Sequence, residues 1–289
     1  MPEFAELLSA LMPYQWQPMV TLVCGAALLL YLSGLARGAA PGFWRNFAFF
    51  LGLGLMYGVT QTQFDYFSQY VFFIHRIQHL VLHHVAAMML VLANPLPVLA
   101  RGTPQPLRDN LLAPLWRSAP VRTGYAVLQQ PAVAAFLFAG LVYFWLIPSI
   151  HFDAMLSGWL YSVMNWSMAL DGLLFWWLVL NPHAPGSGRH CLGYGMRCIL
   201  LAAVAFPQII LGAYIFFYGT GIYEFYEVCG SPWPIDTDTD RVLGGLITWI
   251  PPAMMSVVGL LVVLSQMFRQ EKREAERLGQ GAPATGSTA

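Results

Sequence analysis

The chain has 289 residues, of which 57% are hydrophobic and only 10% charged, with a mean hydropathy of +0.57 and a formal net charge of zero. No soluble domain of this size has so little polar surface to present to water. The composition therefore excludes a soluble globular protein and predicts an all-α, polytopic integral membrane helical bundle. The four cysteines are scattered without a CxxC pair, so neither a disulfide framework nor a zinc ribbon is expected.

Seven apolar stretches are long enough to cross a bilayer, because a membrane-spanning helix needs about 20 mostly apolar residues. The predicted spans cover residues 19–36, 43–60, 69–97, 124–148, 154–180, 194–218 and 242–267. We therefore expect one transmembrane domain over residues 1–268, followed by a charged tail over 269–289 that is disordered at its end. Residues 1–18 contain no Lys or Arg, so no cleaved signal peptide is expected.

The basic residues between the spans predict the orientation of the chain. Seven spans put the termini on opposite sides of the membrane, and one side then holds twelve basic residues: Arg37, Arg45, Arg101, Arg108, Arg117, Arg122, Arg189, Arg197, Arg269, Lys272, Arg273 and Arg277. The other side has only Arg241, beside the acidic loop 219–240. The positive-inside rule places the N-terminus outside and the C-terminus, with the basic loop 101–123, in the cytoplasm. The outer loop, which includes Cys229, is either an ordinary solvated loop or a docking surface for a periplasmic partner.

The third predicted span, residues 69–97, carries four histidines in its first half: His75, His79, His83 and His84. Ionisable residues inside a membrane span are costly and usually functional. An α-helix advances about 100° per residue, so the first three of these histidines line one face. Met89 lies on the same face further along the helix, whereas His84 falls on a different side.

This spacing makes the histidine helix a candidate metal site. Neutral imidazole is a good ligand for copper or zinc, and two histidines four residues apart on a helix can chelate one ion. His75 and His83 are about 12 Å apart along the axis, so we expect one ion to bind a pair of histidines plus a ligand from another helix. Met89 and Met164 are the best-placed thioethers, and thioethers favour Cu(I). The alternative is that the histidines only hydrogen-bond between helices.

Two polar residues are predicted at membrane depth in the fifth span, Asn165 and Asp171. An aspartate there must pair, protonate or line a polar cavity. It either orients the N–H of a histidine ring or accepts a hydrogen bond from a neighbouring Ser, Tyr or Trp. Arg76 lies among the histidines, where its fixed charge disfavours a cation. We expect Arg76 to point outward to the lipid headgroups or to pair with Asp65.

Several stretches of the sequence share features with one known family. The opening WQPMVTLVCGAALLLYLSGLARG is similar to the first span of that family, and the FWW of residues 175–177 fits the end of its fifth span. HRIQHLVLHHVAAMMLVLANP is similar to its signature helix, with matching positions at His75, Gln78, His79 and Pro95. TDRVLGGLITWIP is similar to its final span, with matching positions at Asp240, Gly244, Gly245 and Trp249. The chain thus resembles the CtaG-type cytochrome c oxidase assembly factors, seven-span proteins of bacterial inner membranes.

The chain departs from this family at a few positions. Ala87 and Met88 stand where the family usually has a Pro-Pro pair, and Arg241 stands where it usually has Gln. A histidine expected in the fifth span is missing, and His83 and His84 are additional. These departures concern the ligand set rather than the fold and indicate a divergent member.

The resemblance implies a role in maturing a haem–copper cytochrome c oxidase of the bacterial inner membrane. The protein would bind copper, as Cu(I), and deliver it from the periplasmic side without enzymatic bond-making chemistry. Its partners would be membrane lipid, an oxidase subunit as client and a periplasmic copper donor protein, with no nucleic acid. The expected metal ligands are His75, His79, His83, Met89 and Met164. The expected supporting residues are Gln78, Asn165, Asp171 and Asp240.

Other functions remain open from the sequence alone. A copper transporter or a scaffold protein would have much the same sequence features. A b-type haem subunit needs an axial histidine from each of two helices, and no other span offers one at mid-membrane. The HLVLHH of residues 79–84 resembles one box of a membrane di-iron oxygenase, but such enzymes need about three boxes. The remaining histidines, His151, His183 and His190, are expected to be isolated, with His151 in a tight turn before the fifth span.

Overall fold

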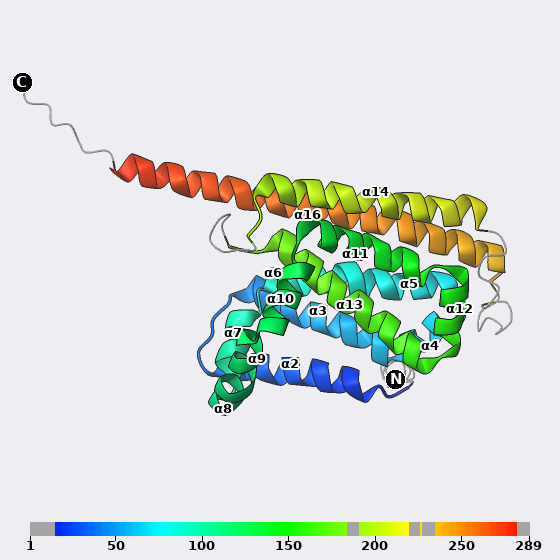
Figure 1. Ribbon diagram of the computed structural model, residues 1–289, viewed down its shortest axis with the longest axis horizontal. Helices are drawn as coiled ribbons and strands as arrows, with labels where there is room; N and C mark the ends of the chain where they lie inside the picture. Colours follow the sequence, from blue (N-terminus) through cyan, green and yellow to red (C-terminus); the bar gives the residue numbers. More distant parts are fainter. Residues whose placement is uncertain (1–14, 184–190, 220–225, 227–234, 282–289) are drawn as a thin grey trace, which may run out of the picture.

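The computed structural model describes residues 15–183, 191–219, 226 and 235–281, with side chains up to Arg277. All regular structure in these residues is helical, and the helices form one elongated bundle (Figure 1). The predicted all-α membrane bundle is therefore confirmed. The predictions about residues 1–14, most of the loop 219–240 with Cys229, His190 and the end of the tail concern residues outside the described ranges.

The first two helices of the described residues form where the sequence predicts them, as α2 (Pro18–Ala36) and α3 (Phe43–Gln61). The ring of Tyr31 on α2 stacks on Phe49 of α3 with 3.7 Å between ring centroids. On its other side α2 packs closely against α7 (Leu96–Gly102), where a Cβ at Gly34 would collide with the backbone of Val98. Small residues at such contacts let membrane helices approach closely.

The prediction of one uninterrupted helix over residues 69–97 is wrong. This region contains α4 (Gln63–Tyr70), α5 (Phe72–Leu80), a π-helical turn η1 (Val81–Val85) and α6 (Ala86–Ala93). Val71 separates α4 from α5 because its backbone is extended, with φ −134° and ψ 118°. Asn94 ends α6 in the left-handed conformation at φ 47°, and Pro95 follows it. The continuous apolar stretch is thus Phe72–Ala93.

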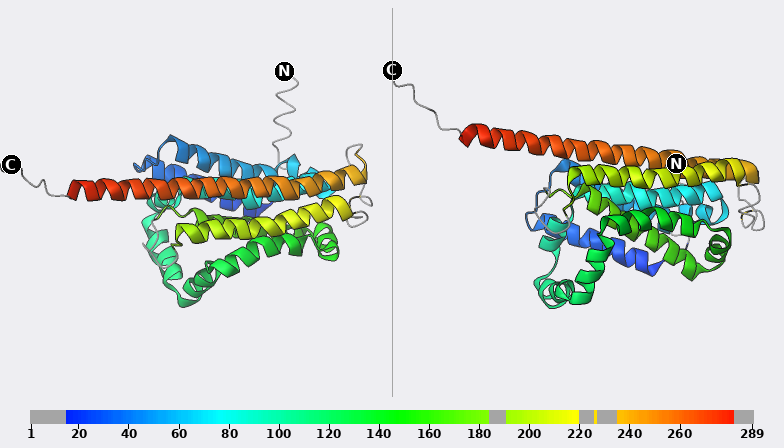
Figure 2. Two further views of the ribbon diagram at one scale, coloured as in Figure 1. Left: turned by 90° about the horizontal axis from the view of Figure 1, so that it is seen from above. Right: turned by 45° about the horizontal axis from the view of Figure 1, so that its top comes forward.

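The basic connector 101–123 is also mostly helical. It contains α8 (Gln105–Leu107), η2 (Arg108–Leu112), α9 (Ala113–Arg117) and the start of α10 (Ala119–Leu128). The next helix, α11 (Pro131–Trp145), is bent by 72° from α10, so the predicted fourth span 124–148 is divided. The break falls before Pro131, where proline disfavours a helical residue ahead of it. Figure 2 shows α7 to α10 projecting from the side of the bundle.

The second half of the chain contains α12 (Pro148–Leu156), α13 (Gly158–Leu180), α14 (Tyr194–Tyr218) and α16 (Thr237–Gly281). The bounds of α14 match the prediction, and Pro207 lies inside it without ending it. His151 and Asp153 lie in the helix α12, so the expected tight turn is wrong. The helix α16 runs beside α14 and continues past the end of the bundle (Figures 1 and 2), so the predicted tail is helical up to Gly281.

Five helical stretches in the described part of the chain are long and apolar enough to cross a membrane, and the bent pair α10–α11 makes a sixth if it counts as one span. The helix α3 has sufficient length, at 19 residues, but a less apolar composition. The predicted number of seven spans and the orientation of the termini stay predictions. The basic connector and the extension of α16 do share one end of the bundle, while α4 and α12 lie at the other (Figure 1).

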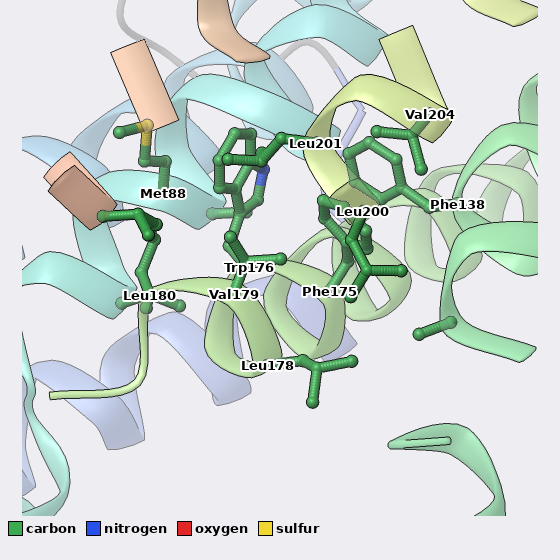
Figure 3. Packing of buried hydrophobic residues seen from close by; sticks show 14 residues of the cluster. Met88, Phe138, Phe175, Trp176, Leu178, Val179, Leu180, Leu200, Leu201 and Val204 are labelled. Carbon is green, nitrogen blue, oxygen red and sulfur yellow. The ribbon is translucent and has the colours of Figure 1, made fainter. Parts of the chain in front are cut away.

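The largest apolar cluster of the described residues packs α6, α11, α13, α14 and α16 together (Figure 3). Phe175 and Trp176 of α13 pack there with Phe138 of α11 and with Leu201 and Val204 of α14. The rings of Phe138 and Phe175 stack with 3.9 Å between centroids. Phe138 also contacts two of the histidines, so this cluster fixes the wall against which they lie.

Candidate functional site

The histidine helix is anchored at its first residues by the last helix of the chain. The carboxylate of Asp240 accepts hydrogen bonds from the backbone N–H groups of Phe72 at 2.8 Å and Phe73 at 2.7 Å. The first N–H groups of a helix have no partner within the helix, so Asp240 caps α5. Gly244 lies one turn further along α16, where a Cβ would collide with the Phe72 ring. The predicted supporting role of Asp240 is thus to position the helix that carries the histidines.

Three buried histidines form the first histidine cluster, which consists of His75, His79 and His151. The ring centroids of His75 and His79 are 4.3 Å apart, and those of His75 and His151 are 5.1 Å apart. All three residues are at most 1% exposed. The first two come from α5 at the predicted helical spacing, whereas His151 comes from α12. The expectation that His151 is isolated is therefore wrong.

The hydrogen bonds of His151 fix which of its nitrogens carries the proton. Its Nδ1 lies 3.0 Å from the backbone oxygen of Trp145, which can only accept, so Nδ1 carries the hydrogen. Its Nε2 then holds a lone pair and accepts from the hydroxyl of Tyr226 at 3.0 Å. Burial lowers the pKa of His151 to about 4, so the ring is neutral at neutral pH. A neutral imidazole is the form that binds metal ions.

His75 and His79 have ring nitrogens without partners. Neither nitrogen of His75 makes a hydrogen bond of acceptable geometry, although the Ser68 backbone lies near, and Nε2 of His79 also makes none. The Nδ1 of His79 lies 3.4 Å from Nη1 of Arg76, which can only donate. Buried polar groups nearly always have a partner, so three unpartnered nitrogens on two adjacent rings indicate a place for a ligand.

A hydrogen-bond network holds the predicted residue Gln78 between the histidines. Its amide nitrogen donates to the Val59 backbone oxygen at 2.7 Å and to Oδ1 of Asp65 at 2.8 Å. The hydroxyl of Tyr161 donates to the same carboxylate oxygen at 2.8 Å, and its ring lies 6.2 Å from that of His75. Burial raises the pKa of Asp65 to about 6, although the hydrogen bonds of Tyr161, Gln78 and Gln69 oppose the shift. Gln78 therefore ties α5 to α3, α4 and α13.

The π-helical turn η1 places His83 and His84 together in a second histidine cluster. Their ring centroids are 4.9 Å apart, and the His83 ring stacks on Phe138 at 4.0 Å. The Nε2 of His83 lies 3.0 Å from Oδ2 of Asp171, so of the two partners left open for this aspartate the geometry fits the histidine. His84, predicted on a different side of the helix from His83, is also buried in the bundle. Single π turns inside α-helices occur frequently at functional sites.

The helix α13 holds η1 in place through contacts with the backbone of His83. The indole N–H of Trp176 donates to the backbone oxygen of His83 at 3.1 Å. Gly172 faces the same peptide group, and a Cβ there would collide with the His83 backbone. These contacts provide a hydrogen-bond donor and close packing where the regular helix is interrupted.

Arg76 lies between the two clusters and does not point outward to the headgroups. It is 5% exposed, and its Nε donates to the hydroxyl of Thr248 at 2.9 Å. It lines a cavity of about 10 Å³, which is room for about one water molecule, together with His79, His83, His84, Met168 and Gln208. A fixed positive charge at this point disfavours a cation in the cavity.

The remaining predicted ligands are divided between different parts of the bundle. Met164 is fully buried in an apolar cluster with Tyr161 and Phe72, which both contact the first histidine cluster. Met89 packs against the cluster around Phe49 of α3 instead. Within the described residues, no three His, Cys, Asp or Glu side chains come close enough to hold a metal ion as they stand. A metal ion in the first cluster would therefore need rotation of a ring or a ligand from outside this set.

Sequence reasoning missed His151 as a neighbour of His75. The available signal was its predicted depth, because it precedes the fifth span on the side where α5 begins. Helical periodicity gives no information about contacts between separate helices, so the pairing became visible only in the folded chain.

Comparison with known proteins identifies relatives over most of the chain. The family model described as cytochrome c oxidase caa3 assembly factor matches residues 29–270. An uncharacterised protein of Mycobacterium leprae is 25% identical over 279 residues, which cover 92% of this chain and 41% of that protein. Uncharacterised proteins of Mycobacterium bovis and Mycobacterium tuberculosis are each 25% identical over 272 residues, covering 89% of this chain and 40% of theirs. The chain thus spans about two fifths of the length of these curated relatives. No solved structure matches.

Proposed function

The chain belongs to the cytochrome c oxidase caa3 assembly factor family, and from this premise we propose that it binds Cu(I) at the first histidine cluster and delivers it to an oxidase. The supporting observation is the pair His75 and His79, whose adjacent buried rings have three nitrogens without hydrogen-bond partners. Both side chains come from one helix turn that Asp240 and Gln78 hold in place. Copper is cargo in this role, and the protein makes and breaks no covalent bond.

The hydrogen bonds around the first histidine cluster determine which ring nitrogens can bind copper. His75 has either nitrogen free, so it supplies a lone pair without losing a bond. His79 binds copper through Nε2 once its proton moves to Nδ1, which ends the long contact with Arg76. His151 already has its lone pair on Nε2 and joins by releasing the Tyr226 hydroxyl. Met164 is the soft ligand nearest to this set by packing.

The position of Arg76 favours delivery on one side of the membrane over transport across it. A copper ion moving from the first to the second histidine cluster would pass the cavity that Arg76 lines. A buried guanidinium opposes such a passage. Together with the predicted orientation, this supports exchange of copper with a periplasmic donor and with the periplasmic face of the oxidase client. The membrane is then the inner membrane of a bacterium.

Copper binding by the purified protein tests this proposal. The protein in detergent is loaded anaerobically with Cu(I) in competition with a chromogenic Cu(I) chelator. We expect stoichiometric Cu(I) in the parent, its loss in the His75→Ala, His79→Ala double variant and its retention in His183→Ala, which changes an exposed histidine far along the chain. Equal copper in the parent and the double variant would refute the assigned site.

A second measurement connects the site to oxidase assembly. Membranes of cells that lack the protein should contain oxidase with less copper, and the parent gene should restore it. The double variant should not restore it although the protein is made in normal amounts. Full restoration by the double variant would leave a scaffold role as the better description.

A further inference from the structure

A second cavity lies beside the first histidine cluster and opens toward the lipid. It has a volume of about 240 Å³ and runs between α2, α3 and α13. Its walls are mostly apolar and include Val20, Val23, Ala27, Leu53, Met56 and Leu173. In Figure 1, α2 lies along the lower edge of the bundle. Large apolar pockets with a few polar groups are the usual form of small-molecule sites.

The crevice is long, narrow and accessible from the bilayer. Its lining on α3 extends from Phe49 to Thr60, which is about 16 Å along the helix axis. Val23 and Leu170 line it and are 41% and 54% exposed, so its mouth is on the lipid-facing surface. A molecule dissolved in the membrane can therefore enter sideways without crossing water.

One polar side chain, Asn165, lies in this apolar wall without a hydrogen-bond partner. It is 5% exposed and lines the crevice, and neither its amide nitrogen nor its amide oxygen makes a hydrogen bond. His79 and Tyr161 are close enough to Asn165 to be influenced by it, but the contacts lack hydrogen-bond geometry. A buried amide without partners is unfavourable, so its presence indicates a ligand that supplies one.

The depth of Asn165 distinguishes between possible ligands. Asn165 is seven residues into α13, or about 10 Å from the end of that helix, and therefore lies within a hydrocarbon core about 30 Å thick. The ester carbonyls of a phospholipid stay at the membrane interface with its headgroup. A quinone is soluble in the hydrocarbon core and carries carbonyls on a ring with an apolar tail.

We propose that the crevice between α2, α3 and α13 binds a membrane-soluble quinone or its hydroquinone, with Asn165 as its polar anchor. A quinone carbonyl accepts from Nδ2 of Asn165, and a hydroquinone hydroxyl donates to Oδ1, so the amide accommodates both forms. The apolar tail lies along α2 and α3. This inference does not depend on copper binding.

Fluorescence of Trp166, which lines the crevice, gives a direct test. The protein in nanodiscs is titrated with decylubiquinone, and the quenching in a Trp166→Phe variant is subtracted to isolate this one indole. We expect the quinone to quench the fluorescence of Trp166 in a saturable manner. Asn165→Leu should weaken the binding at least tenfold, and Ala27→Phe, which fills the crevice, should abolish it. Val257→Phe on the lipid-facing surface of α16 is the matched control and should leave quinone binding unchanged.

Each other outcome contradicts the proposal. Quenching that is linear in quinone, or equal in the parent and Ala27→Phe, means that quinone only dissolves in the disc. Quenching of Trp166 by lipid with brominated acyl chains, with no displacement by quinone, means that the crevice holds a phospholipid chain. Unchanged affinity in Asn165→Leu, with binding lost in Ala27→Phe, overturns the assignment of Asn165 as the anchor.

Discussion

Asp240 and Phe72 are 168 residues apart in the chain, yet Oδ2 of Asp240 accepts a hydrogen bond of 2.8 Å from the backbone N–H of Phe72. The other carboxylate oxygen of Asp240, Oδ1, accepts a hydrogen bond from the backbone N–H of Phe73. The last helix thus caps the helix that carries the first two histidines of the candidate site. Because the cap fixes where α5 begins, it also fixes the depth and direction of His75, which follows Phe72 by three residues.

Loss of this cap should loosen the start of the histidine helix. Asp240→Ala removes the carboxylate that accepts from one buried and one partly buried N–H group, so we expect a loss of about 1–2 kcal/mol in the free energy of unfolding. Asp240→Asn keeps one acceptor oxygen, so its free energy of unfolding should lie between those of the parent and the alanine variant. Hydrogen exchange of a peptide covering residues 69–80 measures the local effect. Equal protection in all three proteins would show that the cap has no part in holding α5.

The contact between Gly244 and Phe72 predicts a pair of coupled substitutions. A Cβ at position 244 collides with the Phe72 ring, so Gly244→Ala should destabilise the protein by about 1–3 kcal/mol. Phe72→Leu makes room, and we expect the two substitutions together to cost less than the sum of the two alone. Unfolding in mixed SDS micelles measures all four proteins of this cycle. Strictly additive effects would argue against the close contact.

Gly172 and Gly54 form a matched pair of helical glycines with opposite surroundings. A Cβ at Gly172 collides with the backbone of His83, which cannot move without disturbing η1, whereas a Cβ at Gly54 has nothing within 4 Å. Gly172→Ala should destabilise the protein by about 2 kcal/mol or more. Gly54→Ala should stabilise it by up to about 1 kcal/mol, since alanine favours a helix over glycine. Similar midpoints of unfolding for the two variants would contradict the packing of α13 on η1.

The raised pKa of Asp65 predicts a dependence of stability on pH. Burial raises the pKa of this carboxyl in the folded protein to about 6 from 3.8, so the folded protein holds a proton that the unfolded chain releases. The contribution of Asp65 to the free energy of unfolding is thus full below about pH 4 and is lost as the pH rises through about 6. His151 acts oppositely: its pKa falls to about 4 from 6.5, so its contribution is lost as the pH falls.

Asp65→Asn removes the first of these two effects and keeps the hydrogen-bonding shape of the side chain. Relative to the parent, the variant should gain about 2 kcal/mol in the free energy of unfolding between pH 4 and pH 6.5. It should also lose stability more steeply on acidification, because the effect of His151 is no longer opposed. Unfolding midpoints at several pH values in one detergent provide the measurement. Parallel pH profiles of parent and variant would contradict the buried state of Asp65.

Helical periodicity predicted part of the candidate site and failed where the helix changes type. His75 and His79 lie together as their spacing indicates, because α5 is a regular α-helix. The π turn η1 then adds a residue to one turn, which rotates every later residue by about 100° relative to an uninterrupted α-helix. This rotation turns Met89 away from the face of His75 and His79, and Met89 packs against the cluster around Phe49 of α3. The sequence contains no signal for that turn, since the contacts that stabilise it come from Asp171, Gly172 and Trp176.

The sequence by itself determined that the protein is a helical membrane bundle and that one of its helices carries imidazoles at membrane depth. These properties follow from composition and from local periodicity, because hydrophobic length and helix geometry act along the chain. Only the tertiary structure decided that His151 joins His75, that Asp240 caps α5 and that Asn165 lines a crevice toward the lipid. Each of these depends on contacts between helices far apart in sequence, and the close packing of whole side chains selects such contacts.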